Sequence, residues 1–179
     1  MTPQTKLYGL MAEFESPDHL LEAAEKTRDA GYKKIDAYAP YPIHGLSEAL
    51  GLAETKVPLI VLCGGICGVL GGFFMMYYSA VITYPINIGG RPYNSWPAFI
   101  PITFECMILL SAFAAVLGML GLNGLPAPYH PVFNVESFAR ASQDKYFLVI
   151  ESRDPHFDVD KTREFLKSLG PEEIAEVAP

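Results

Sequence analysis

One carboxyl side chain occurs where carboxylates are seldom found. Between Val57 and Val135 the chain carries only two charged residues, Arg91 and Glu105. Glu105 lies inside an apolar run, where a carboxyl group is costly and normally faces a protein interior or a wet cavity. Two interpretations are open. Glu105 contributes to a proton pathway shared with a neighbouring chain, or it pairs with Arg91 or a backbone group near the end of the run that is closer to Arg91.

Residue types that hold metals and haem are present, but they do not form ligand sets. Cys63 and Cys67 are four residues apart, a spacing that can hold a metal, yet both lie in an apolar run where small residues pack helices, as does Cys106. The sequence has no Cys-x-x-Cys-His motif for haem attachment and no cysteine quartet for an iron–sulfur cluster. The four histidines lie outside the apolar runs: His19, His44, His130 and His156. We therefore expect no cofactor, no metal and no catalytic residue on this chain.

Two apolar runs must position Glu105 and the cysteines. The first, 57–82, has no charge, and the second, 99–122, has only Glu105. A hydrocarbon core of about 30 Å takes roughly 20 helical residues to cross, and neither run has the polar face of a soluble helix. The sequence predicts a transmembrane hairpin with spans at 57–82 and 99–122. Pro, Gly and aromatic residues at 83–98 are typical of an outer loop at the membrane interface.

Small residues recur on one face of each predicted span. They are Gly64, Gly68 and Gly72 in the first span, and Ser111, Ala115 and Gly118 in the second. Small side chains let helix backbones approach closely in lipid. We expect the two stripes to pack on each other, and glycines beyond this seam to form a docking surface for other membrane helices.

The polar flanks, 1–56 and 123–179, have matching β-α-β patterns. The first predicts a strand at 6–14, a helix from Ser16-Pro17 to Ala30 and a strand at 35–41; the second predicts a strand at 146–152, a helix capped by Asp158 and a strand at 174–178. Each half alone is too small to bury a core. The predicted fold class is a membrane α plus α/β protein. Its two-helix transmembrane hairpin is inserted between the two halves of a ferredoxin-like cytoplasmic domain.

Charge limits the possible partners, and the lack of a signal-peptide pattern indicates the orientation. A net charge of −7 without a Lys/Arg cluster argues against nucleic-acid binding and against a polybasic lipid anchor. Residues 1–56 lack the basic and apolar regions of a signal peptide. We therefore expect the first span to direct insertion, with both termini in the cytoplasm.

Several stretches resemble a known family. They are 41–46, 48–52, 84–92, 95–105 and 124–131, and together with the spans they cover nearly the whole chain. They resemble the ActD subunit of alternative complex III, a quinol:electron-acceptor oxidoreductase of bacterial respiratory and photosynthetic membranes. The resemblance implies a two-span subunit of the bacterial inner membrane with a cytoplasmic domain and no cofactor of its own. It places haem c and iron–sulfur clusters on partner subunits, and quinol oxidation in multi-span partners.

Five further residues are candidates for subunit contacts. Asn87, Arg91 and Trp96 lie in the predicted outer loop, where they either contact a peripheral redox subunit or are solvated loop residues. His44 and His130 flank the hairpin on the cytoplasmic side and could approach each other, although a hydrogen-bonded interfacial histidine is the favoured interpretation of each.

The sequence thus favours a structural and assembly subunit of a membrane oxidoreductase, in which Glu105 could contribute to a proton or quinol path. Two alternatives remain. A small channel or transporter made of oligomerised hairpins would need a row of polar residues on one helix face, whereas a membrane-tethered ligand sensor would need convergent polar groups in a cleft of the polar domain.

Overall fold

The computed structural model describes residues 7–179, so Lys6, the predicted start of the first strand, lies outside the described residues. The chain divides into two compact units. We call them the sheet unit, Met1–Ala53 with Pro128–Pro179, and the hairpin unit, Glu54–Ala127.

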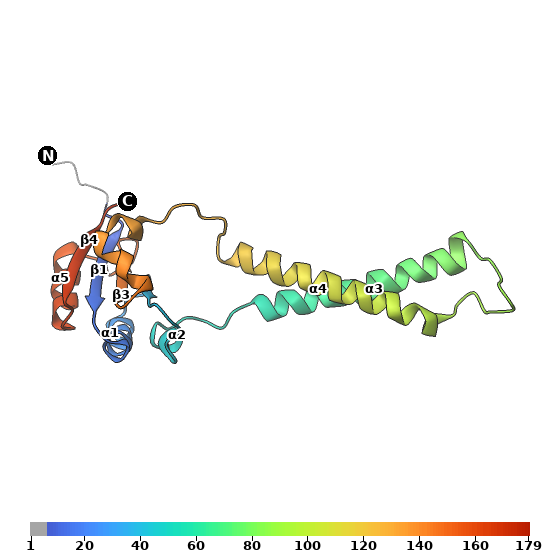
Figure 1. The fold of residues 1–179 in the computed structure, drawn as a ribbon, viewed down its shortest axis with the longest axis horizontal. Coiled ribbons are helices and arrows are strands. Elements are labelled where there is room, and N and C mark those ends of the chain that lie inside the picture. Colours follow the sequence, from blue (N-terminus) through green and yellow to red (C-terminus); the bar gives the residue numbers. More distant parts are fainter. Residues whose placement is uncertain (1–6) are drawn as a thin grey trace. The chain divides into compact units, whose positions relative to one another are not determined.

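A four-stranded antiparallel sheet joins the two flanks of the sequence in the sheet unit (Figure 1). Its strands are β1 (Gly9–Phe14), β2 (Ile35–Tyr38), β3 (Tyr146–Glu151) and β4 (Glu173–Val177), in the order β2-β3-β1-β4. Strand β1, from the N-terminal flank, lies between β3 and β4 of the C-terminal flank. The two flanks therefore build one sheet.

Strand β2 is shorter than the sequence predicted. It pairs with β3 only from Ile35 to Tyr38, whereas the expected strand continued to residue 41. Pro40 and Pro42 follow, and neither has a backbone N–H with which to extend a ladder. Tyr41 still contacts β3, because its hydroxyl lies 2.7 Å from the hydroxyl of Tyr146.

Helices α1 (Pro17–Asp29) and α5 (Val159–Ser168) cover one face of the sheet. Both begin where the sequence predicted: the Ser16 hydroxyl accepts a hydrogen bond from the His19 N–H at 3.2 Å, and the Asp158 carboxylate accepts one from the Lys161 N–H at 3.0 Å. Alternate strand residues and the helices form the larger core, which includes Leu10, Phe14, Leu20, Leu148, Ile150 and Leu166. The short helix α2 (Leu46–Ala49) packs beside this core.

The opposite face of the sheet has a cover that the sequence did not predict. Two 3-10 turns, Pro131–Asn134 and Glu136–Ser142, bring Val132 and Phe138 onto Phe147 and its neighbours on the strands. Turns this short have no apolar periodicity from which to identify them.

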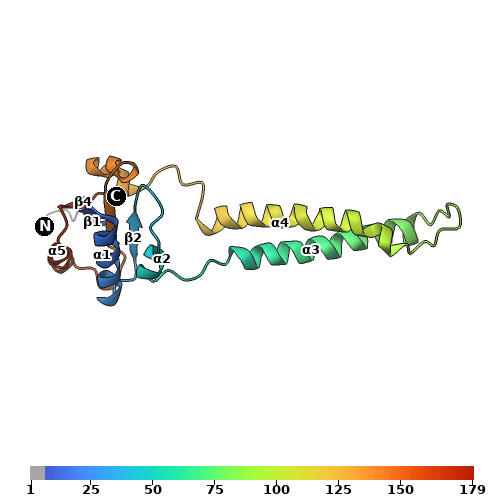
Figure 2. The ribbon, with the colours of Figure 1, turned by 60° about the horizontal axis from the view of Figure 1, so that its bottom comes forward.

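The hairpin unit consists of two long antiparallel helices (Figure 2). Helix α3 (Val57–Tyr77) continues through a π-helical segment, Tyr78–Thr83, and a 3-10 turn, Trp96–Phe99, leads into α4 (Ile100–Leu122). The two stretches have 27 residues each and are long and apolar enough to cross a membrane. At about 1.5 Å per residue each extends roughly 40 Å.

Burial separates these helices from the core helices of a soluble protein. In the most apolar 18-residue window, 17% of residues are buried in the first stretch and 0% in the second. A soluble core helix would instead be mostly buried. Apart from their mutual seam, the two helices present apolar side chains outward.

Candidate functional site

The predicted glycine stripe of α3 lies against α4. A Cβ atom built on Gly68 would lie 2.6 Å from the carbonyl oxygen of Cys106 and 2.6 Å from the Cα of Met107. A Cβ on Gly72 would lie 2.9 Å from the Cβ of Cys106, and one on Gly64 would lie 2.6 Å from the Cβ of Ala114. The two backbones therefore approach to a distance that only glycine permits at these positions.

The small residues of α4 divide between this seam and the surface beside it. The Ser111 hydroxyl oxygen would lie 2.8 Å from a Cβ on Gly65, and a Cβ on Gly118 would lie 3.0 Å from Ile60. Ala115 is partly exposed. Gly71 is exposed, with nothing within 4 Å of a Cβ built on it, so it lies outside the seam.

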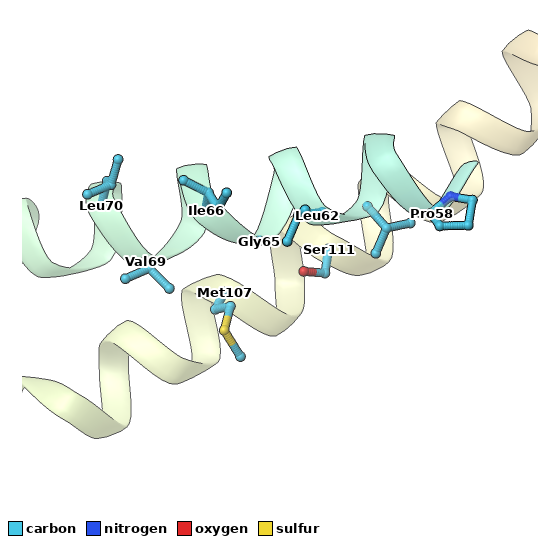
Figure 3. Close-up of a pocket in the computed structure, with 9 residues that line it drawn as sticks. Pro58, Leu62, Gly65, Ile66, Val69, Leu70, Met107 and Ser111 are labelled. Carbon is cyan, nitrogen blue, oxygen red and sulfur yellow. The ribbon is translucent and has the colours of Figure 1, made fainter. Parts of the chain in front are cut away.

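An apolar groove of about 520 Å³ runs along one side of the seam (Figure 3). Its α3 wall includes Leu62, Ile66 and Val69, and its α4 wall consists of Met107 and Ser111. Ser111 is the one hydroxyl among its lining residues. The groove has the character of a site for an apolar chain or helix and lacks groups for chemistry.

Glu105 lies on the side of α4 that faces away from α3. Two residues before it, Thr103 contacts the seam at Gly72, and two residues after it, Met107 contacts the seam at Gly68. At about 100° per residue, Glu105 is roughly 160° around the helix from both. Its side chain is exposed, and within residues 7–179 no ion pair joins it to Arg91. Within the described residues, neither Arg91 nor a backbone group of the hairpin therefore pairs with Glu105.

The loop between the helices exposes its polar and aromatic side chains. Asn87 closes a turn, because its side-chain oxygen accepts a hydrogen bond from the Gly90 N–H at 3.0 Å. Arg91 and Trp96 are exposed. Arg91 lines a pocket of about 350 Å³ whose other residues are apolar or tyrosine, including Met76 and Phe99. The loop thus combines one cation with a largely apolar surface.

His44 and His130 have different surroundings in the sheet unit. Nδ1 of His130 accepts a hydrogen bond from the Val132 N–H at 3.5 Å, so Nε2 carries the proton and donates to the Tyr8 hydroxyl at 3.2 Å. Tyr8 in turn donates to the carboxylate of Glu151 at 3.4 Å. His44 is exposed in the turn before α2. The described residues include no contact between the two histidines.

Sequence reasoning missed the polar cluster around Tyr8. Burial, followed by the carboxylate of Glu151, raises the pKa of Tyr8. Burial and the carboxylate of Asp36 also raise the pKa of Tyr38. The His130-Pro131 pair was its one sequence signal, because the histidine side chain caps a turn that proline begins.

Asp154 is a second polar residue that the sequence did not single out. Its side chain is fully buried and accepts hydrogen bonds from the backbone N–H groups of Lys33, Lys34 and His156 at 2.6, 2.7 and 2.8 Å. Burial alone would raise its pKa, but the N–H groups of Lys34, His156 and Lys33 outweigh burial and lower the pKa. Asp154 therefore fastens the turn before β2 to the turn after β3.

A buried carboxylate in β1 was also overlooked. Glu13 is 6% exposed, and its carboxylate lies 3.8 Å from Arg140 and 4.0 Å from Lys145. Its alternation with Met11 places it on the face covered by the 3-10 turns. The ion pair between Glu13 and Arg140 therefore links the second 3-10 turn to β1.

Ligand sets for metals are not found among the described residues. No three His, Cys, Asp or Glu side chains of residues 7–179 lie close enough together to hold a metal ion. Cys63 and Cys67 are exposed on α3, and Cys106 is partly buried in the seam. The expectation that this chain carries no cofactor stays a prediction.

Comparison with known proteins identifies the family. A search of curated proteins found no match. The family model described as "Alternative complex III, ActD subunit" matches residues 8–176, which include both flanks of the sheet unit and the whole hairpin. The resemblance noted in the sequence is thereby confirmed, and the chain belongs to the ActD family of alternative complex III subunits.

Proposed function

We propose that this chain is a cofactor-free structural and assembly subunit of a membrane quinol:electron-acceptor oxidoreductase. As a member of the ActD family, it partners other subunits of an electron-transport complex. The observation that carries the proposal is the exposure of the hairpin. Two 27-residue apolar helices bury little beyond a narrow glycine seam, which leaves their remaining faces free for partner helices or lipid.

The shared sheet supports a topology in which both flanks of the chain lie on the same side of the membrane. Because both contribute strands to one sheet, the hairpin must leave and re-enter the same side of the membrane. We place this side in the cytoplasm of a bacterial inner membrane. The strand order β2-β3-β1-β4 with α1 and α5 on one face supports a ferredoxin-like assignment of the sheet unit.

Partner contacts follow from this orientation. The outer loop would meet haem c and iron–sulfur subunits through Asn87, Arg91 and Trp96, whose exposed side chains are available for contact. The helices would meet the multi-span subunits that oxidise quinol. His44 is exposed and His130 partly exposed, so both are available to a partner on the cytoplasmic side.

Glu105 supplies the functional part of the proposal. We place it in a proton path shared with a neighbouring subunit, because it is the only charged residue in either span and faces away from α3. Glu105→Gln keeps the size and hydrogen-bonding capacity of the side chain but cannot release a proton. This variant should assemble normally and lower proton-coupled turnover of the complex. Wild-type turnover would exclude the proton path.

The subunit role is tested by purifying the tagged chain in mild detergent, followed by haem staining and mass spectrometry. We expect multi-haem, iron–sulfur and multi-span proteins to co-elute in fixed ratio. A colourless chain that elutes alone or as a homo-oligomer would contradict the proposal and favour the channel or sensor alternatives. As a control, the same purification from cells with the untagged chain reports the background.

A further inference from the structure

Glu105 has no hydrogen-bond or ion-pair partner among residues 7–179, although it is far from either end of its helical stretch. It follows Trp96 by nine residues, which corresponds to about 13 Å along the helix at about 1.5 Å per residue. A glutamate side chain is too short to reach water over this distance. Arg91 forms no ion pair with it, and α3 packs on the opposite side of α4. A hydrogen-bond donor for this carboxyl must come from another molecule.

The surroundings of Glu105 have the pattern of a helix-docking face. Residues at helical spacing on the same side of α4 are exposed and otherwise apolar; we call them the Glu105 face: Pro101, Glu105, Ile108, Ala112 and Met119. Ala112 is small enough for another backbone to approach closely. The face thus offers one polar group on an apolar strip, with close packing possible about two turns away.

The possible occupants of this face differ in what they offer a carboxyl group. Lipid acyl chains have no donor. In a symmetric contact through this face, a second copy of this chain would set one carboxyl against another, because Glu105 is the only charged residue of both spans. The apolar groove beside the seam does not include Glu105. A helix from a different subunit can bring a complementary charge or donor to this depth.

We propose that the Glu105 face binds a transmembrane helix of another subunit of the complex, and that this helix donates a hydrogen bond to the Glu105 carboxyl group from a basic or amide side chain. The inference rests on the proposed subunit role and adds the face, the anchoring residue and the chemistry of its partner. The surrounding apolar residues supply area, while Glu105 sets the depth and rotation of the partner helix.

Site-specific photo-crosslinking in the intact complex tests the proposal. A photoreactive amino acid at Ala112 reports the Glu105 face, and the same probe at Phe113, one residue around the helix and also exposed, is the matched control. We expect the Ala112 probe to capture a transmembrane peptide of another subunit that contains a basic or amide residue. The Phe113 probe should give at least fivefold less of this product.

Variants of Glu105 then test whether its carboxyl group is required for the partner helix to bind. Glu105→Leu should reduce the Ala112 product at least tenfold, whereas Glu105→Gln, which keeps an acceptor, should retain most of it. Protection of the Cys106 thiol against labelling in both variants would show that the hairpin seam is intact, since Cys106 lies against Gly68 and Gly72.

The possible failures are distinct. If the wild-type tagged chain does not co-purify with other subunits, the proposed function fails. If the complex co-purifies but the Ala112 probe captures only lipid or a second copy of this chain, the inference alone is overturned. It is likewise overturned if Glu105→Leu leaves the product and the subunit composition unchanged.

Discussion

The sheet unit and the hairpin unit are held together by different kinds of side chain. In the sheet unit, large residues such as Phe14, Leu148 and Ile150 are at most 1% exposed and fill a layer between sheet and helices. In the hairpin unit, the buried residues of α3 are Gly65, Gly68 and Gly72. The sheet unit is stabilised by burying large apolar side chains. The hairpin unit is stabilised by the close approach of two helix backbones at glycine residues.

The difference follows from the solvent of each unit. In water, burying apolar area is itself favourable, at about 25 cal/mol per Å². In lipid, a leucine gains almost nothing by moving from an acyl chain to another helix, so the helices associate through close packing and hydrogen bonds. The same sequence must therefore satisfy two opposite rules, large residues inside the sheet unit and small residues inside the hairpin. Removing side-chain atoms should therefore destabilise the sheet unit most, whereas adding side-chain atoms should destabilise the hairpin most.

The largest expected effect is a cavity in the sheet unit. Leu148→Ala removes a side chain that is 0% exposed from the centre of β3 and should destabilise this unit by about 2–5 kcal/mol. Hydrogen–deuterium exchange of the full chain in detergent measures both units at once. Amides of β1 and β3 should exchange faster, while those of α3 and α4 remain at wild-type rates. Faster exchange in the helices as well would show that the units are energetically coupled.

Asp154 gives a smaller and pH-dependent effect in the same unit. Asp154→Asn replaces a carboxylate that accepts three backbone N–H groups by an amide that presents N–H of its own, at a cost of about 1.5–3 kcal/mol. The pKa of Asp154 is lowered by folding, so its contribution is present above the unfolded pKa of about 3.9 and is lost as pH falls through the lower folded value.

Exchange of the Lys33 and Lys34 amides between pH 3 and pH 7 checks this prediction. In the wild type, protection relative to the intrinsic rate should decrease below about pH 4. In Asp154→Asn it should be low throughout and lose this acid-dependent step. Leu169, whose N–H donates to the backbone carbonyl of Leu166 at 3.1 Å and therefore to no titrating group, serves as the internal reference. An unchanged step in the variant would assign the titration to another carboxyl group.

Much of this organisation can be predicted from one sequence, because it depends on local patterns. The caps at Ser16 and Asp158 and the long apolar runs have direct physical causes in neighbouring residues. The glycine spacing at 64, 68 and 72 predicted one packing face, and in the structure these residues lie on the side of α3 that contacts α4. In each case the residues that determine the feature lie within a few turns of each other.

The features that escaped prediction depend on contacts between distant segments. Asp154 binds N–H groups about 120 positions earlier in the chain, and Tyr8 contacts His130 across 122 positions. Neither pairing has a local signature, since an aspartate in a turn and a tyrosine in a strand are ordinary residues there. The direction of Glu105 likewise required knowing which residues of α4 contact α3. The spacing of residues along a helix shows which of them share a face. Which face is buried depends on the element that packs against the helix.

The smallest change tests the rule for the hairpin. Gly68→Ala adds one carbon where a Cβ would lie 2.6 Å from backbone atoms of Cys106 and Met107, which no side-chain movement can relieve. The helices must separate, at a cost of about 1–3 kcal/mol. Gly71→Ala is the matched control: it adds the same carbon three residues along the same helix, where nothing lies within 4 Å.

Labelling of Cys106 in a background with Cys63→Ala and Cys67→Ala reads the seam directly, because Cys106 is the remaining thiol and lies against Gly68 and Gly72. Gly68→Ala should accelerate labelling, whereas Gly71→Ala should leave the rate unchanged. Equal rates in both variants would mean that close backbone approach does not hold the hairpin. If Gly71→Ala left the Cys106 rate unchanged but lowered the yield of the assembled complex, then the exposed glycine would belong to a second packing surface. The small residues of α3 would then serve two neighbours, α4 on one side and a partner subunit on the other.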